Sequence, residues 1–183
     1  PGFSGALGHP FLEVTVMTIQ VGERIPDSIL TESVEFGEAC PVAPAKIGVA
    51  DALKGKKVVI FGLPGAYTPT CSAQHVPGYL AALPDLKGKG IDEVWCIAVN
   101  DGFVMAAWGR DQKAIGKIRF LGDGSADLAK KLGLELDLSA GGMGMRMQRF
   151  SILVDDGVVK GINVEKGGKF EVSDAQTMLK QLA

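Results

Sequence analysis

Cysteine and histidine are scarce in this chain, and their scarcity argues against a disulfide framework and against a metal site. It has three cysteines, Cys40, Cys71 and Cys96, and only two histidines, His9 and His75. An odd and small number of cysteines does not build a disulfide framework and favours a reducing compartment over secretion. We therefore expect a cytoplasmic protein, with an organelle as the alternative. Because no two cysteines stand at the spacing of zinc ligands, we expect no metal site.

A dominant charge and a long apolar run are also missing. The chain has 19 Lys and Arg against 21 Asp and Glu, which gives a net charge of −2. This balance provides no electrostatic footprint for nucleic acid or for an acidic membrane surface. No apolar run is long enough to cross a bilayer. We expect neither nucleic acid nor membrane as a partner, and 183 residues that are 46% hydrophobic suffice for one domain with a full core.

The first sixteen residues differ from the rest of the chain. Residues 1–16 contain three glycines and two prolines, and a more regular pattern begins at Met17. We interpret residues 1–16 as a vector leader or other non-native extension, and residues 17–183 as a single domain. A signal remnant is one alternative, although no basic region precedes an apolar one. A genuine strand over residues 12–16 is another.

Apolar runs and turn residues predict alternating strands and helices. Buried strands are expected over residues 57–63, 93–99 and 117–121, a weak edge strand over 31–36, a hairpin over 149–154 and 158–164, and helices over 46–53, 72–87, 103–113 and 125–131 with a terminal helix after Ser173. Strand–helix alternation implies parallel pairing, whereas the closing hairpin is antiparallel. The pattern therefore predicts an α/β protein with a thioredoxin-like fold, in which helices flank both faces of a mixed central sheet.

Local signals refine these helices. We expect Pro77 to kink or break the helix over residues 72–87. Asn100 and Asp101 can cap the helix that follows them, and Ser125 can cap the next, which Gly133 ends. Ser173 and Gln176 form a capping-box pattern for the terminal helix. Residues 139–144 are expected to be a glycine-rich loop.

Cys71 stands where an apolar strand gives way to a helix. The strand over residues 57–63 ends at a Pro-Gly turn that begins with Pro64, and Cys71 follows at the expected helix start. The free N–H groups and positive dipole at such a place favour thiolate over thiol. Thr68 lies three residues earlier and can orient the sulfur by hydrogen bonding. The alternative is a buried structural cysteine, which behaves as a small hydrophobic residue.

Three cationic or titratable residues are candidates to act with Cys71. Arg146 and Arg149 precede the hairpin, and a guanidinium fork stabilises a thiolate and a leaving oxygen without losing its proton. The pattern alone does not choose between them, and either can be a surface arginine. His75 would share a helix face with Cys71, but we expect it to be structural and satisfied by a backbone partner. Cys40 is expected to be a bystander.

The turn and the cysteine together resemble the active-site signature of peroxiredoxins, Pro64-x-x-x-Thr68-x-x-Cys71. The longer match resembles the type II, peroxiredoxin-5-like subfamily and extends over about residues 19–183; it includes residues 64–72, 75–78, 99–105 and 132–137 and the pair Arg149-Phe150. The resemblance implies a thiol-dependent peroxidase that reduces hydrogen peroxide and alkyl hydroperoxides and serves antioxidant defence and redox homeostasis. It also implies a homodimer.

The resemblance implies a role for each matching residue. Cys71 is the peroxidatic cysteine, whose thiolate attacks the O–O bond and becomes a sulfenic acid. Thr68 hydrogen-bonds the thiolate and the peroxide, Pro64 shields the sulfenate from water, and Arg149 brings a fixed positive charge. No metal, haem or flavin cofactor is required, because sulfur supplies both electrons.

The step that removes the sulfenic acid has two candidate routes. Cys96 lies 25 residues after Cys71, a spacing similar to that of plant two-cysteine members, which suggests a Cys71–Cys96 disulfide. However, Cys96 is flanked by apolar residues, as on a central strand, and bridging requires Cα atoms about 4.4–6.8 Å apart. The alternative is a one-cysteine cycle, with glutathione, glutaredoxin or thioredoxin as reductant.

Two other functions stay open. One is a peroxide-sensing redox switch that uses Cys71 without turnover. The other is a glutaredoxin-like thiol–disulfide oxidoreductase, against which the missing Cys-x-x-Cys pair argues.

Overall fold

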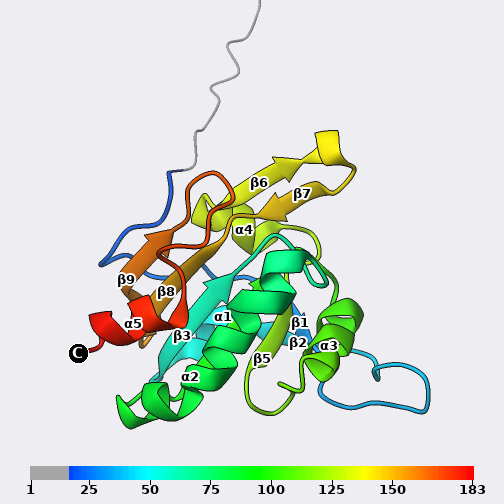
Figure 1. Cartoon of the computed structure of the whole chain (residues 1–183), viewed down its shortest axis with the longest axis horizontal. Coiled ribbons are helices and arrows are strands. Elements are labelled where there is room, and N and C mark those ends of the chain that lie inside the picture. Colours follow the sequence, from blue (N-terminus) through cyan, green and yellow to red (C-terminus); the bar gives the residue numbers. More distant parts are fainter. Residues whose placement is uncertain (1–16) are drawn as a thin grey trace, which may run out of the picture.

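A seven-stranded mixed sheet forms the centre of the protein (Figure 1). The computed structural model describes residues 17–183, so the expectations about residues 1–16 lie outside the described residues. The strands of the sheet are β1 (Ile29–Glu32), β2 (Ala45–Gly48), β3 (Lys57–Gly62), β4 (Glu93–Ala98), β5 (Arg119–Gly122), β8 (Phe150–Asp155) and β9 (Val158–Val164). Their order is β2-β1-β5-β4-β3-β8-β9. As predicted, β3, β4 and β5 are parallel and the closing hairpin of β8 and β9 is antiparallel. The pairs β1–β2, β1–β5 and β3–β8 are also antiparallel.

Helices cover both faces of this sheet (Figure 1). The helices α1 (Val49–Leu53) and α4 (Asp127–Leu132) contribute buried side chains to the apolar cluster on one face. The helices α2 (Val76–Gly88), α3 (Gly102–Asp111) and α5 (Ala175–Gln181) contribute to the cluster on the other. Strands buried on both sides explain the continuous apolar runs in the sequence. The predicted thioredoxin-like architecture is confirmed.

A second, two-stranded sheet stands beside the main one (Figure 1). It is the hairpin of β6 (Glu135–Leu138) and β7 (Gly144–Met147), which a single 3₁₀ turn at Ser139–Gly141 connects. The prediction had only a glycine-rich loop over residues 139–144 and no strands here. Both strands are short and half-exposed, so they carry little of the apolar pattern by which strands are recognised.

Two predictions near the N-terminus are wrong in detail. The edge strand expected over residues 31–36 is β1, which begins earlier and lies between β2 and β5. The helix expected over residues 46–53 is divided, because residues 45–48 pair with β1 and only Val49–Leu53 is helical. Backbone pairing with β1 overrides the weak helical pattern at this point.

Two helix caps also differ from the prediction. Ala126, not Ser125, is the N-cap of α4, and the carboxylate of Asp123 accepts hydrogen bonds from the backbone N–H groups of Leu128 (3.2 Å) and Ala129 (2.8 Å). Asp174, not Ser173, caps α5 and accepts from the Thr177 N–H at 3.0 Å. Caps are set by local backbone geometry, which residue type alone constrains only weakly.

The other two cap predictions are confirmed. The Asp101 carboxylate caps α3 by accepting from the Val104 N–H at 2.9 Å. Gly133 ends α4 in the left-handed conformation with φ 66°, a conformation that favours glycine.

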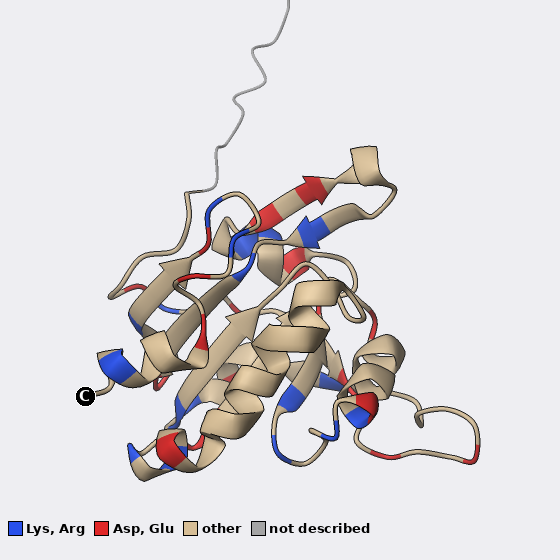
Figure 2. Cartoon of the chain, in the orientation of Figure 1, with Lys and Arg blue, Asp and Glu red and all other residues tan. Residues whose placement is uncertain are grey.

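Basic and acidic residues are interspersed along the helices, strands and loops (Figure 2). Within the described residues, no helix is long and apolar enough to span a bilayer.

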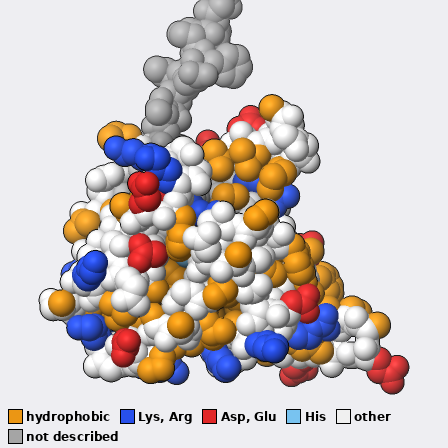
Figure 3. All heavy atoms as spheres, viewed as in Figure 1, with side chains coloured by type: hydrophobic (Ala, Val, Ile, Leu, Met, Phe, Trp, Pro, Cys, Tyr) orange, Lys and Arg blue, Asp and Glu red, His pale blue; other side chains and the backbone are white. Residues whose placement is uncertain are grey.

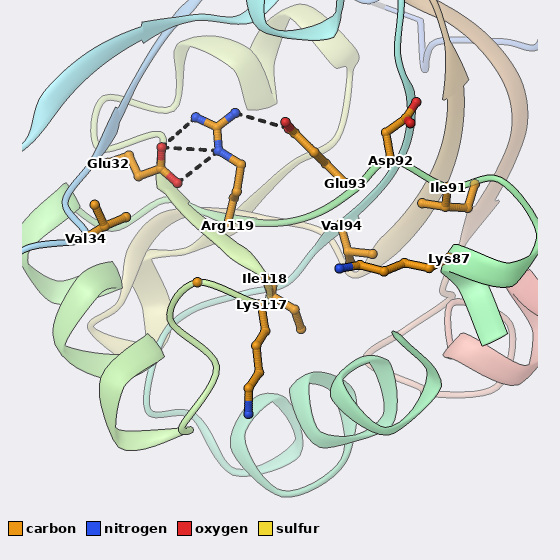
Figure 4. Close-up of a pocket in the computed structure, with 11 residues that line it drawn as sticks. Glu32, Val34, Lys87, Ile91, Asp92, Glu93, Val94, Lys117, Ile118 and Arg119 are labelled. Carbon is orange, nitrogen blue, oxygen red and sulfur yellow. Dashed lines mark hydrogen bonds and ion pairs between the residues drawn. The ribbon is translucent and has the colours of Figure 1, made fainter. Parts of the chain in front are cut away.

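A cavity of about 250 Å³ lies at the amino ends of β4 and β5, where an ion-pair network closes one side (Figure 4). The Arg119 guanidinium lies between two carboxylates, with Nη2 2.5 Å from Glu32 Oε2 and Nη1 3.2 Å from Glu93 Oε2. Lys56 Nζ pairs with the same Glu93 at 2.6 Å. Burial raises the pKa of Glu93, but hydrogen bonds from Lys56, Trp95 and Arg119 outweigh it and hold the pKa below its ordinary value. These groups satisfy one another, so the network is structural and joins β1, β4 and β5.

Removing the central cation should destabilise the fold. In Arg119→Ala, Glu32 and Glu93 lose their shared partner, and because both are partly buried we expect a loss of about 1 kcal/mol in the free energy of unfolding. Urea denaturation measures this loss. Lys117→Ala is the matched control, because Lys117 lines the same cavity and removes one positive charge without breaking the network. An Arg119→Ala midpoint equal to the parent's would contradict the assignment.

Candidate active site

Side-chain hydrogen bonds hold the turn after β3 in place. The Ala66 N–H donates to Asn100 Oδ1 at 2.9 Å, and the Thr68 hydroxyl donates to the Gly65 carbonyl at 2.8 Å. Tyr67 adopts a positive φ of 62°, which is unusual for a bulky residue, and its hydroxyl donates to Asp111 on α3 at 2.7 Å. The turn is thereby tied to the end of β4 and to α3.

Cys71 lies in the first turn of the helix that follows, as expected. Helical structure begins at residue 69, and Cys71–His75 form a π-helical turn in which the Val76 N–H donates to the Cys71 carbonyl. The π turn leads directly into α2, so Pro77 does not break the helix. The regular α-helical hydrogen bonding is instead interrupted by the π turn just before Pro77, which has no N–H to donate. Cys71 is fully buried.

Arg149 reaches Cys71 because of the register between β3 and β8. Phe150 pairs with Gly62, and its ring fills the space above that glycine, where a Cβ would lie 2.2 Å from Phe150 Cε1. Arg149 therefore stands beside the residues that leave β3 for the turn. Its Nη2 donates to Cys71 Sγ at 3.4 Å. Its Nε is buried and has no hydrogen-bond partner among the described residues.

Arg146, the rival arginine, lies elsewhere. Its Nε donates to the Met143 carbonyl at 2.8 Å within the β6–β7 hairpin. Its Nη1 donates to the Pro64 carbonyl at 3.4 Å. The structure therefore brings Arg149, and not Arg146, to the sulfur. Arg146 instead connects the hairpin to the turn through its two hydrogen bonds.

His75 is fully buried and contacts Arg149. Its Nε2 donates to the Ser173 carbonyl, 3.2 Å away, so Nδ1 carries the lone pair and accepts from Arg149 Nη1 at 3.1 Å. Burial, reinforced by the positive charge of Arg149, lowers the pKa of His75 to about 3. The backbone partner was expected, but the contact with Arg149 was not.

A cavity of about 550 Å³ opens beside these residues. Pro64, Thr68 and Arg149, three of the predicted site residues, line it. Much of its wall is apolar and comes from the hairpin and the turn, namely Leu136, Leu138, Met143 and Pro69; Figure 3 shows hydrophobic side chains gathered over the β6–β7 hairpin. Because the Thr68 hydroxyl already donates to Gly65, it can only accept a hydrogen bond from a ligand.

Cys96 shares an apolar cluster with Cys71. It lies on β4 between Phe61 of β3 and Phe120 of β5 and is fully buried. Burial, together with the negative charge on Cys71, raises the pKa of the Cys96 thiol well above its ordinary value. Cys40 is exposed, and all three cysteines are unpaired.

Two residues that shape the site were missed from the sequence. The sequence pattern indicates Asn100 only as a helix cap, but Asn100 also follows β4, and residues just beyond adjacent parallel strands meet at one edge of the sheet. Glu165 follows β9 and lines the cavity beside Arg149; no sequence pattern marked it. No group of three metal-ligating side chains lies close together within residues 17–183.

Comparisons with known proteins agree on one family. The Redoxin family model matches residues 20–179. The curated Peroxiredoxin-2B of Arabidopsis thaliana is 46% identical over 164 residues, which cover 90% of this chain and 98% of that protein. Among solved structures, reduced Prx3 of Vibrio vulnificus in complex with hydrogen peroxide is 42% identical with a TM-score of 0.83, covering 91% of this chain and 100% of that one. A Burkholderia cenocepacia protein provisionally described as a thioredoxin reductase is 54% identical with a TM-score of 0.86, covering 91% and 99%.

The His75 ring should stay neutral across the physiological range. In His9→Ala, His75 is the one histidine left in the sequence, and its ¹⁵N shifts should show the Nε2–H tautomer throughout about pH 5–8. The unfolded chain protonates this ring near pH 6.5 and the folded protein only at about 3, so its contribution to stability falls as the pH drops through that window. A titration near pH 6.5 in the folded protein would contradict this environment.

Proposed function

This chain belongs to the type II, peroxiredoxin-5-like branch of the peroxiredoxin family and is a thiol-dependent peroxidase; from that premise we propose that Cys71 is the residue that attacks the peroxide. The observation that carries this proposal is the contact between Cys71 Sγ and the Arg149 guanidinium at 3.4 Å, at the side of a cavity that Arg149 lines. A fixed cation beside a sulfur favours the thiolate, which is the nucleophilic form.

The first step is a two-electron transfer from sulfur to oxygen. The Cys71 thiolate attacks one peroxide oxygen, the O–O bond breaks, and the leaving oxygen takes a proton from solvent to become water or an alcohol. Cys71 is then a sulfenic acid. Negative charge moves from sulfur to the leaving oxygen during this step, and the Arg149 guanidinium, which contacts Cys71 Sγ and lines the cavity, is proposed to stabilise it.

His75 does not act as the base. Its Nδ1 lone pair already accepts from Arg149, and its pKa of about 3 leaves no proton affinity at neutral pH. Thr68 is proposed to accept a hydrogen bond from the bound peroxide, because its own proton is donated to Gly65. Pro64, in the cavity wall, is proposed to limit the access of water to the sulfenic acid.

The cavity supports both hydrogen peroxide and alkyl hydroperoxides as substrates. The polar side that includes Thr68 and Arg149 suits the O–O group. The apolar side formed by Leu136, Leu138 and Met143 suits an alkyl substituent. The Vibrio vulnificus relative is described in complex with hydrogen peroxide, which supports the same ligand here.

We propose that an external thiol, of the glutathione, glutaredoxin or thioredoxin kind, removes the sulfenic acid. One thiol condenses with it to a mixed disulfide and water, and a second thiol releases Cys71 and leaves as a disulfide. Cys96 is the less suitable nucleophile, because it is buried on the central strand β4 and its raised pKa keeps it protonated. The alternative is a Cys71–Cys96 disulfide.

The oligomeric state and the compartment are further proposals. A homodimer is supported by two exposed large hydrophobic side chains, Tyr67 in the turn after β3 and Phe103 in the first turn of α3, which are 54% and 48% exposed. A cytoplasmic location is supported by the three unpaired cysteines.

Replacing the proposed nucleophile should abolish turnover. In Cys71→Ser we expect the consumption of hydrogen peroxide and of cumene hydroperoxide, with dithiothreitol as the reductant, to fall to the uncatalysed background, because a serine hydroxyl is not ionised at neutral pH. Cys40→Ser is the matched control and should keep the parent rate, since Cys40 is exposed on a loop outside the site. Equal rates for Cys71→Ser and the parent would refute the role of Cys71.

Intact-mass spectrometry after one equivalent of peroxide should separate the two routes. If an external thiol resolves the sulfenic acid, the parent and Cys96→Ser both gain one oxygen on Cys71, and added glutathione converts it to a mixed disulfide. An internal bridge would instead give a loss of two hydrogens in the parent that disappears in Cys96→Ser. That second result would establish the Cys71–Cys96 disulfide and overturn the external route.

A further inference from the structure

Glu165, just after β9, holds the segment of residues 171–173 through a single carboxylate oxygen. Its Oε1 accepts hydrogen bonds from the backbone N–H groups of Glu171, Val172 and Ser173, each at 2.8 Å, and from the Ser173 hydroxyl at 2.9 Å. Burial raises the pKa of Glu165, but these bonds, led by that from the Ser173 N–H, outweigh it and hold the pKa below its ordinary value. The carboxylate is therefore ionised, and it orients three successive peptide groups.

The segment that Glu165 holds is the one that orients His75. The Ser173 carbonyl accepts from His75 Nε2 at 3.2 Å and from the Tyr79 hydroxyl at 2.9 Å. A carbonyl can only accept, so this bond places the ring proton on Nε2 and leaves the Nδ1 lone pair to receive Arg149 Nη1. The other terminal nitrogen of Arg149 donates to Cys71.

Two more contacts link Glu165 and its segment to the same arginine. The Glu165 N–H donates to the Arg149 carbonyl at 2.9 Å, so the two residues are bonded through their backbones. The ring of Phe170, within the segment that leads to Ser173, lies 5.7 Å from the guanidinium carbon of Arg149, a cation–π distance. The Arg149 side chain is thus restrained by its own backbone hydrogen bond, by the Phe170 ring and by His75. Glu165 makes the first of these contacts and holds the segment that makes or orients the other two.

We propose that Glu165 is a positioning residue for the peroxidase site, which acts through Ser173 and His75 to aim the Arg149 guanidinium at Cys71. The inference rests on the proposed role of Cys71 and deepens it. Glu165 does not contact the sulfur in this arrangement; its effect reaches Cys71 through the direction of a hydrogen bond. A carboxylate that only anchored the loop would contribute to stability and leave the reactivity of Cys71 unchanged.

Three variants separate these roles. Glu165→Ala removes the acceptor, whereas Glu165→Gln keeps an oxygen of the same reach and removes the charge. Glu135→Gln is the control, because Glu135 is an exposed carboxylate on β6. Each protein is assayed for the second-order rate constant with hydrogen peroxide and for melting temperature. The rate at which iodoacetamide alkylates Cys71 is followed across pH by mass spectrometry of the Cys71 peptide.

We expect Glu165→Ala to lower the peroxide rate constant by about tenfold, the scale typical of residues that orient a reactive group from one step away. The pH at which alkylation of Cys71 reaches half its maximum should move upward, because the thiolate loses an aligned cation. Glu165→Gln should recover part of both effects. Glu135→Gln should match the parent in every measurement.

A double variant tests the route of action. If Glu165 acts through the guanidinium, Glu165→Ala should cost nothing further once Arg149→Ala is present. Equal losses in the presence and absence of Arg149 would overturn the inference. So would a Glu165→Ala protein that melts earlier but keeps the parent alkylation profile and peroxide rate. A parent protein that alkylates at Cys71 but consumes no peroxide would instead refute the proposed function, so the two failures are distinguishable.

Discussion

The structure around the site depends on one constraint, which is that the Arg149 guanidinium is buried and cannot lose its proton. An isolated cation out of water costs several kcal/mol, so it must be surrounded by groups that compensate it. Here those groups are the Cys71 sulfur, the Nδ1 lone pair of His75 and the face of the Phe170 ring. The thiolate proposed for the peroxidase reaction of Cys71 would supply the negative charge that these neutral partners lack. Burial of the arginine therefore favours a negative charge on the sulfur, which is also the charge that the proposed reaction needs.

The central sheet provides the rigidity that this arrangement needs. Cys71 is carried on a turn and helix that follow β3, and Arg149 stands at the start of β8, which pairs with β3 residue by residue. Because Gly62 has no side chain, the Phe150 ring can lie against β3. This contact fixes the position of Phe150, and with it that of the adjacent Arg149, along β3. On the other side of the turn, Asn100 after β4 accepts from Ala66. A sulfur and a guanidinium that are far apart in sequence are therefore held at contact distance by backbone pairing.

Burial has opposite consequences for the two inner cysteines. Cys71 and Cys96 share one apolar cluster and are equally inaccessible, yet only Cys71 has a cation at hydrogen-bonding distance. Cys96 feels mainly the low dielectric and the charge on its neighbour, both of which disfavour its thiolate. The contact with Arg149 therefore distinguishes Cys71 from Cys96, which supports the proposal that an external thiol, and not Cys96, removes the sulfenic acid. Spacing in the sequence could not show this difference, because it is a property of strand position and of what packs against it.

Sequence alone determined the α/β architecture, the three parallel strands, the closing hairpin and the place of Cys71 at a helix start, since apolar periodicity and Pro-Gly punctuation record burial and turns locally. It did not determine the β6–β7 hairpin, whose short half-exposed strands leave almost no apolar pattern, nor the caps at Asp123 and Asp174. The family resemblance already favoured Arg149 over Arg146, but only the tertiary structure showed its contact with Cys71, its contact with His75 and the hydrogen bonds that Glu165 accepts from residues 171–173. Each depends on the register of β8 against β3 or on a loop folding back over the sheet, and contacts between residues distant in the chain are set by packing, which no local pattern encodes.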